Sequence, residues 1–235
     1  MPDRPAMSYD LVSFDLDGTL VDTAAEIAEA ANLALAAHGI APRPLAEITA
    51  LIGAGTRELM RRLLARCVED QPSLAQHVPF DALMASFDAH YAQTTGTSAT
   101  PYTGCREALL QLRQAGLRLA CTASKDLRHT ERVLAVTGLD SFFDLVVGGD
   151  SLAEKKPHRS VLEHVMQELQ CRAERTAHVG DSSIDVQAAR NAGVSAWVVP
   201  YGYNGGQPIE SANPDRIFDG LLDVAHHALA ARAVS

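Results

Sequence analysis

Short apolar runs alternate with helical stretches along most of the chain, and this alternation restricts the possible folds more than any other feature. Consecutive parallel strands need a crossover that packs on the sheet, and a helix usually provides it. The order therefore predicts an α/β fold with a parallel, doubly wound sheet. The expected strands cover residues 11–14, 117–121, 143–147, 177–179 and 196–199, with a last one at 216–218; the helices between them cover residues up to 114, 128–136, 160–169 and 184–191.

One segment departs from this alternation, because it contains helical patterns and no strand. These patterns lie at about residues 23–38, 46–52, from 56 onward, and 80–93. A stretch rich in threonine, serine, glycine and proline then forms a loop before the alternation resumes. We therefore expect a small helical domain of residues 24–95, inserted after the first strand of a core made of residues 1–23 and 96–235.

The bulk composition excludes several classes of partner. The chain has 235 residues and a formal net charge of -9, so its mean field repels nucleic acid and anionic membranes. No apolar run reaches the roughly 18 residues of a membrane span, and Met1–Asp10 lacks the apolar centre of a signal peptide. The cysteines are scattered without a zinc-type spacing, as in a reducing compartment: Cys67, Cys105, Cys121 and Cys171. We expect a cytoplasmic protein.

Two carboxylates mark the end of the first expected strand. Asp15 and Asp17 are separated by one residue and are followed by Gly18 and Thr19. Side chains two apart on a strand project to the same side, and ligands of open α/β sheets bind beyond the carboxyl ends of the strands. Two acids placed there repel each other unless a cation or a shared proton lies between them. Capping of the next helix is an alternative explanation for the pair.

Further polar side chains lie at the ends of the other expected strands. Thr122 ends the second strand, and its hydroxyl can donate to a phosphoryl oxygen. Lys156 follows the third strand and can neutralise a second phosphoryl oxygen. Asp181 ends the fourth strand, with Asp185 four residues later. Carboxylates, one hydroxyl and one cation at strand ends are the groups that metal-assisted phosphoryl transfer requires.

These residues resemble the haloacid dehalogenase superfamily of phosphohydrolases. Phe14–Thr23 is similar to its first motif, Thr122 within Leu119–Lys125 to the second, Lys156 before Pro157 to the third, and Val179–Asp185 to the fourth. The four motifs occur in order and span nearly the whole chain. The resemblance implies a Rossmann-like core with a helical cap that corresponds to residues 24–95.

The resemblance also implies a mechanism, a phosphomonoesterase reaction through an aspartyl-phosphate. In it Asp15 attacks phosphorus and Asp17 acts as the general acid and base. Thr122 and Lys156 orient and neutralise the phosphoryl group. Mg²⁺ is the expected cofactor, and its expected ligands are Asp15, the backbone carbonyl of Asp17, Asp181 and, directly or through an outer shell, Asp185.

Within the superfamily, the phosphoglycolate phosphatases are the most similar group, on the stretches Leu51–Met60 and Pro200–Asn204. Those enzymes usually carry Thr-Asn-Lys at the second motif, where this chain has Thr-Ala-Ser-Lys, so a phosphatase for another sugar phosphate or a nucleotide, including one of a specialised pathway, stays open. The sugar phosphomutases of the β-phosphoglucomutase type carry a histidine on the first cap helix, and Ala24–Glu29 has none. A member without catalytic activity is disfavoured, because every catalytic position is filled.

We expect the substrate to be a small phosphorylated metabolite. The protein itself is expected to be a monomer or a homodimer. Arg57 follows the glycine-rich cap loop and is the expected cap residue for recognition of a carboxylate or sugar hydroxyl. The full set of expected substrate-binding residues is Gly18, Thr19, Gly53, Arg57, Ala123 and Ser124.

Overall fold

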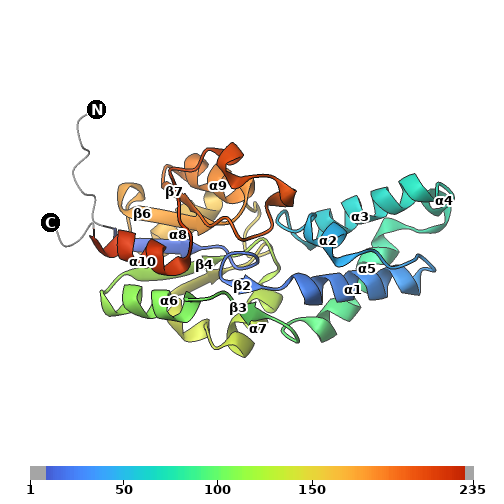
Figure 1. The fold of residues 1–235 in the computed structure, drawn as a ribbon, viewed down its shortest axis with the longest axis horizontal. Helices are drawn as coiled ribbons and strands as arrows, with labels where there is room; N and C mark the ends of the chain where they lie inside the picture. Colours follow the sequence, from blue (N-terminus) through green and yellow to red (C-terminus); the bar gives the residue numbers. More distant parts are fainter. Residues whose placement is uncertain (1–8, 231–235) are drawn as a thin grey trace.

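A six-stranded parallel sheet forms the centre of the computed structural model, which describes residues 9–230 (Figure 1). The strand order is β5-β4-β1-β6-β7-β8. The chain starts in the middle at β1, builds outward to β5 on one side, then returns to build β6 to β8 on the other. This is the predicted doubly wound topology. The strands are β1 (Leu11–Phe14), β4 (Arg118–Thr122), β5 (Leu145–Val147), β6 (Thr176–Gly180), β7 (Ser195–Val198) and β8 (Arg216–Ile217).

Helices cover both faces of this sheet. They are α6 (Cys105–Gln114), α7 (Leu127–Thr137), α8 (Ser160–Glu168), α9 (Ser183–Ala192) and α10 (Leu221–Ala230). Apolar side chains of α6, α7 and α10 share one buried cluster with alternate strand residues, and those of α8 and α9 share a second cluster with the other strand residues. All four residues of β1 are buried as a result, which explains why this strand reads as a continuous apolar run.

The inserted helices form a third cluster with its own apolar core. They are α1 (Ala24–Ala37), α2 (Leu45–Thr49), α3 (Thr56–Asp70), α4 (Leu74–His77) and α5 (Phe80–Thr94). In Figure 1 they extend beyond the carboxyl ends of the strands, with α1 and α5 side by side. The division of the chain into a core and a cap at residues 24–95 remains a prediction.

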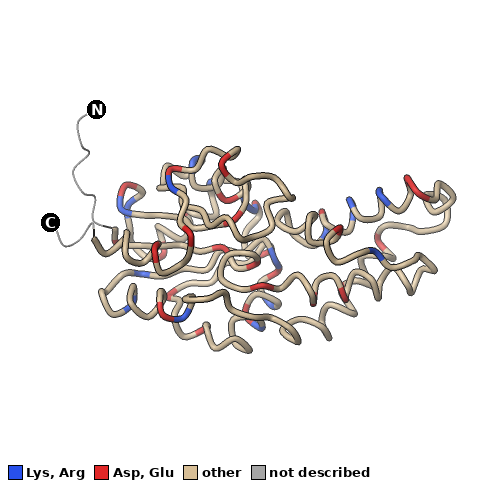
Figure 2. Tube along the Cα trace, viewed as in Figure 1, with Lys and Arg blue, Asp and Glu red and all other residues tan. Residues whose placement is uncertain are grey.

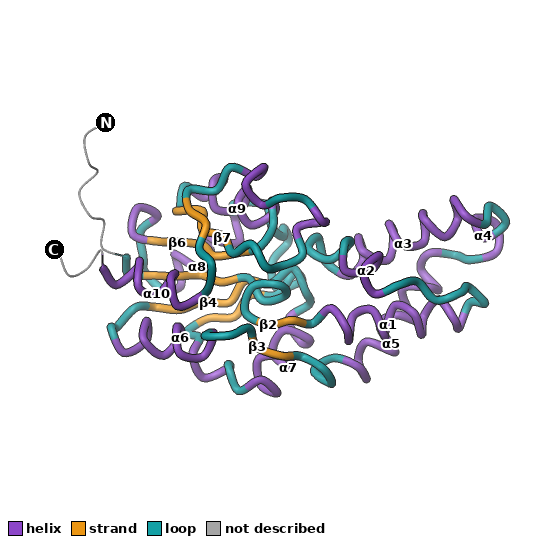
Figure 3. The backbone as a smooth tube through the Cα atoms, in the orientation of Figure 1, coloured by secondary structure: helices purple, strands orange, loops and turns teal. Residues whose placement is uncertain are grey.

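Two linkers join the helices to the sheet, and they contact each other. The strand β2 (Val21–Asp22) pairs antiparallel with β3 (Thr100–Pro101) at the junction seen in Figure 3. Glu26 in α1 is fully buried, and its Oε2 accepts the backbone N–H of Gly96 at 2.8 Å. Thr94 donates through its hydroxyl to the backbone oxygen of Glu26 at 3.2 Å. Hydrogen bonds therefore hold the start of α1 against the end of α5 and the linker that follows it.

Some elements were not expected from the sequence. They are α10, which has ten residues, and the short elements β2, β3, α4 and four 3₁₀ turns: Asp140–Phe142, Ala173–Arg175, Asn204–Gly206 and Ile209–Ala212. The short elements have two to four residues and span about one helical period or less, which hides them in the sequence. The strand expected from Phe143 starts at Leu145, because the chain leaves the turn at Asp140–Phe142 just before it.

The ends of the chain bear on two of the sequence-based expectations. Residues 1–8, which contain most of the segment considered for a signal peptide, lie outside the described residues. Within residues 9–230, none of the helices combines the length and the apolar composition that crossing a lipid bilayer requires.

Candidate active site

Three neighbouring strand ends bring the expected catalytic residues to one edge of the sheet. Asp15 follows β1, Thr122 ends β4, and Asp181 follows β6. Asp185 lies in the first turn of α9, directly after β6. The buried carboxylates of Asp15, Asp181 and Asp185 each offer one oxygen, and these oxygens lie within 4.8 Å of one another. Oxygen donors of this kind are the ligands that Mg²⁺ prefers, so the residues present fit a magnesium ion.

Lys156 provides a positive charge inside this group of acids. Its Nζ lies 2.8 Å from Oδ1 of Asp15 and 2.7 Å from Oδ1 of Asp185. Burial raises the pKa of the Asp15 carboxyl to about 7, with the charge of Asp185 acting in the same direction and Lys156 opposing both. Burial and Asp185 also raise the pKa of Asp181 well above its usual value. Burial alone would raise the pKa of Asp185. Its pKa nevertheless lies well below the usual range, because Lys156 and His178 stabilise the charged carboxylate. A bound cation would relieve the remaining repulsion.

Two hydrogen bonds and the close approach of a glycine fix the position of the Asp181 carboxylate. The Thr19 hydroxyl donates to its Oδ1 at 3.0 Å, and the backbone N–H of Tyr203 donates to its Oδ2 at 2.6 Å. Gly18 adopts a positive φ of 87°, and a Cβ at this position would lie 2.5 Å from Asp181 Oδ2. Only glycine allows this close approach of the loop to the carboxylate. Gly18 and Thr19 therefore support an acid rather than face the substrate cavity.

Asp17 occupies a different environment from the other acids. Its Oδ1 accepts the hydroxyl of Thr23 at 2.5 Å and lies 2.7 Å from Nζ of Lys125. The Lys125 side chain is 2% exposed, and its Nζ lies 5.4 Å from the centre of the Tyr91 ring. Since Asp17 is paired with a lysine of its own, its carboxylate stays apart from the three acids that can share a metal. Lys125 was not among the expected site residues, although it lies three positions after Thr122.

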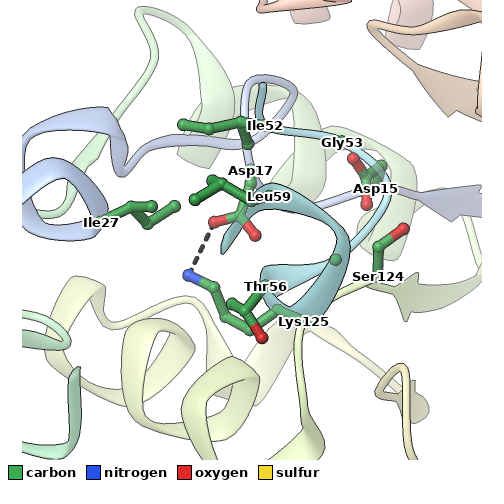
Figure 4. A pocket seen from close by; sticks show the side chains of 10 residues that line it. Asp15, Asp17, Ile27, Ile52, Gly53, Thr56, Leu59, Ser124 and Lys125 are labelled. Atoms are coloured by element: carbon green, nitrogen blue, oxygen red, sulfur yellow. Dashed lines mark ion pairs between the residues drawn. The ribbon is translucent and has the colours of Figure 1, made fainter. Parts of the chain in front are cut away.

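A cavity that opens to solvent is lined by residues of the sheet edge and of the inserted helices. Figure 4 shows the aliphatic side chains of Ile27, Ile52 and Leu59 around Asp17, on the side away from Asp15 and Ser124. The lining residues are Asp15, Asp17, Ile27, Ile52, Gly53, Gly55, Thr56, Leu59, Ser124 and Lys125. The wall that the inserted segment contributes is therefore mainly apolar, and Lys125 is the only cationic side chain among the described residues of this lining.

The sequence as a whole matches a known family. The haloacid dehalogenase-like hydrolases match residues 12–199. The chain belongs to this family. The match includes the strand ends that carry Asp15, Thr122 and Asp181, and all of the inserted helices.

Several relatives of this haloacid dehalogenase-like hydrolase are named as phosphatases. A phosphoglycolate phosphatase of Cupriavidus necator, named as the plasmid form, is 39% identical over 210 residues, which cover 89% of this chain and 89% of that protein. The phosphoglycolate phosphatase of Nitrosospira multiformis is 38% identical over 215 residues, 90% of this chain and 92% of that protein. The expected class, a phosphoric monoester hydrolase of this superfamily, is therefore confirmed.

Solved structures support the same fold. A crystal structure named as a predicted phosphoglycolate phosphatase from Haemophilus somnus superposes with a TM-score of 0.87 at 29% identity, and covers 93% of this chain and 97% of that chain. The CbbY protein of Rhodobacter sphaeroides in complex with phosphate gives a TM-score of 0.74 at 23% identity, which shows a shared fold alone.

The structure brings most of the expected site residues of this hydrolase together, and leaves one apart. Gly53 and Ser124 line the cavity, whereas Ala123 is buried in the apolar core and is absent from the lining. Arg57 is not in the lining. Its side chain is 64% exposed, pairs with Asp81 at 2.9 Å, and lies over the Phe80 ring. Arg57 is one of four arginines of α3, the others being Arg61, Arg62 and Arg66, and Figure 2 shows basic positions along this helix. Helical spacing turns it away from Thr56 and Leu59, which do line the cavity.

Replacement of Arg57 by alanine is therefore expected to change KM for anionic esters by less than about twofold, because an exposed ion pair of this type contributes little. The measurement is KM across a panel of phosphate esters, with Lys125→Met as the matched variant that removes the cation of the cavity. A rise in KM of fivefold or more for Arg57→Ala would show that Arg57 contacts the substrate after all.

Proposed function

We propose that the chain is a Mg²⁺-dependent phosphomonoesterase that works through an aspartyl-phosphate intermediate. One observation supports this most directly: Asp15 lines the cavity next to Asp17, is paired with Lys156, and lies within reach of a shared metal with Asp181 and Asp185. A nucleophile, a separate acid and a cation are the three groups that transfer of a phosphoryl group to a carboxylate requires.

In the first half-reaction, an oxygen of Asp15 attacks phosphorus and the bond from phosphorus to the ester oxygen breaks. Asp17 donates its proton to the departing oxygen. The hydroxyl of Thr122 and the ammonium of Lys156 hold the other phosphoryl oxygens. In the second half-reaction, Asp17 takes a proton from water, the water oxygen attacks phosphorus, and the bond between Asp15 and phosphorus breaks.

The metal would supply positive charge that offsets the negative charge of the transferring group. We propose that the carboxylates of Asp15 and Asp181 and the backbone carbonyl of Asp17 hold it. Asp185 fits a supporting role, because each of its oxygens already accepts from two partners, with His178 as the second partner of Oδ1, whereas among the described residues each oxygen of Asp181 accepts from one. Its Oδ1 accepts from Lys156, and its Oδ2 accepts from the hydroxyl of Ser182 at 2.6 Å and from the backbone N–H of Ser182.

We propose phosphoglycolate as the substrate. The relatives described above are named as phosphatases of this compound, and the cavity suits a short, anionic leaving group. Ile27, Ile52 and Leu59 offer no partner to the hydroxyls of a sugar, and each unpartnered hydroxyl costs about 1–3 kcal/mol. A carboxylate, by contrast, is favoured by the positive charge of Lys125, which belongs to the lining although its ammonium is buried and paired with Asp17. The same aliphatic wall disfavours the alternatives, another sugar phosphate or a phosphomutase reaction on a sugar.

The test is phosphate release from phosphoglycolate, pentose and hexose phosphates, and nucleoside monophosphates, with Mg²⁺ and with excess EDTA. We expect kcat/KM for phosphoglycolate to exceed the others by at least about tenfold, since several unpaired hydroxyls add their costs. EDTA is expected to lower the rate by at least about 100-fold, with recovery on addition of Mg²⁺. Phosphate release that persists in EDTA would contradict the metal requirement. If another ester gave the highest kcat/KM, that ester and not phosphoglycolate would be the substrate.

We also propose a cytoplasmic location. The four cysteines, all within the described residues, are free thiols. Free thiols are typical of a reducing compartment. A monomer or homodimer stays the prediction for the assembly.

A further inference from the structure

The first helix of the inserted segment begins without a cap from the side chain of its N-cap residue. Thr23 occupies the N-cap position of α1, where a threonine usually accepts a hydrogen bond from a backbone N–H of the first turn. No such bond is present at this helix start. The Thr23 hydroxyl instead donates to Oδ1 of Asp17 at 2.5 Å. The residue that would cap the helix is thus used to hold the general acid.

A residue from the core takes the place of the Thr23 cap, and it shares the N–H of Ala24 with Oδ1 of Asp22, which accepts it at 3.1 Å. The phenol oxygen of Tyr203 accepts the backbone N–H of Thr23 at 2.9 Å and that of Ala24 at 3.1 Å. Its O–H donates to Oδ1 of Asp22 at 2.7 Å. One oxygen therefore binds three consecutive residues, and these residues are the linker between β2 and α1. Tyr203 is 9% exposed, so water does not readily replace these bonds.

The other end of the same residue reaches the acidic group. The backbone N–H of Tyr203 donates to Oδ2 of Asp181 at 2.6 Å. Tyr203 also packs against the catalytic loop, since a Cβ at Gly18 would lie 2.9 Å from its ring. The loop after β7 thus connects a carboxylate of the predicted metal site to the start of the helical segment.

The position of α1 matters for the cavity, because Ile27 lies one helical turn after Thr23 and forms part of the apolar wall. We propose that Tyr203 is a positioning residue for substrate binding: its phenol caps α1 from the core, and so sets the place of Ile27 and keeps Thr23 on Asp17. Tyr203 does not itself touch the substrate cavity. The proposal rests on the proposed function only for its kinetic readout.

The test compares Tyr203→Phe with the wild type. This variant keeps the ring and the backbone N–H to Asp181, and removes only the oxygen that holds the linker. We expect KM for phosphoglycolate to rise about fivefold, the effect of one typical hydrogen bond, with kcat changed less than about threefold. Affinity for inorganic phosphate and for Mg²⁺, each measured by calorimetry, should stay within about twofold, because both bind to the core. Tyr9→Phe is the matched control, since it removes a buried phenol that contacts Ser195 away from the linker.

Amide hydrogen exchange gives a readout that needs no substrate. Exchange should accelerate in the peptide of residues 21–26 in Tyr203→Phe and stay unchanged in residues 176–180 of β6. An unchanged KM together with unchanged exchange would overturn the proposal. An equal loss of phosphate affinity would also overturn it, by placing Tyr203 in the phosphate site, and so would a loss of Mg²⁺ affinity. If phosphoglycolate proves not to be the substrate, the exchange result still decides on the role of Tyr203.

Discussion

Replacement of Asp15 by asparagine is expected to lower kcat by at least about 10⁴-fold, because an amide does not attack phosphorus and no other carboxylate occupies its place. The fold should persist, since asparagine has the same shape and its oxygen can still accept from Lys156. The measurement is steady-state phosphate release, with thermal unfolding as a check on the fold. Calorimetry should show that the variant still binds inorganic phosphate, which would mean that the chemical step is lost and the binding site is kept.

A matched control for Asp15 lies at the other end of the same strand. Asp10 precedes β1 and forms an ion pair with Arg175 at 2.7 Å, far from the cavity. The variant Asp10→Asn should keep kcat within about twofold, as expected for a surface pair. If Asp15→Asn retained turnover within tenfold of the wild type, the covalent mechanism would be wrong. Because asparagine can revert by deamidation, residual activity must be checked against the mass of the purified variant.

Replacement of Asp17 by asparagine is expected to lower kcat by about 10²- to 10⁴-fold, the usual contribution of a general acid or base. The effect should be smaller with p-nitrophenyl phosphate, whose leaving group departs without a proton. Water activation in the second half-reaction still needs Asp17, so full recovery is not expected with either ester. The backbone carbonyl is unchanged, and affinity for Mg²⁺ measured by calorimetry should therefore stay close to that of the wild type.

The comparison between the two esters is the decisive part of the Asp17 experiment. Equal rates for the variant and the wild type on phosphoglycolate would remove Asp17 from acid–base chemistry. A similar loss on both esters would restrict its role to the second half-reaction. Lys125 lies 2.7 Å from the carboxylate, so an asparagine there also leaves a buried ammonium without its anion. Thermal unfolding of Asp17→Asn should be measured beside the kinetics for this reason.

The sequence was sufficient to predict the sheet, because the core strands are mainly apolar and buried, and most of them end at or just before a glycine or a polar residue. The motif positions Asp15, Thr122, Lys156 and Asp181 could be predicted for the same reason: the ends of parallel strands meet at one edge. The pair β2 and β3 was not predicted, since two residues carry no periodicity and, unlike the equally short β8, these strands lie outside the six-stranded sheet.

The residues that shape the cavity were harder to predict. Ile27 and Leu59 are apolar residues at helical spacing, which in a sequence look the same as any core residue. Arg57 attracted attention as a charged residue beside a glycine-rich loop, yet the helix directs it to solvent. Tyr203 and its partner Thr23 are 180 positions apart, so their contact depends on how the helices lie against the core. Local pattern carries no information about such contacts.

The buried carboxylate of Glu26 has a consequence for the construction of chimeric enzymes. Glu26 belongs to the helical segment, but its partners do not: its Oε2 accepts the N–H of Gly96, and Lys125 offsets the burial that raises the pKa of its carboxyl. A helical segment transplanted onto another core would bring an unpaired acid into the junction, at a cost of several kcal/mol. An exchange of substrate preference between members of the family must therefore transfer Gly96 and Lys125 together with the helices.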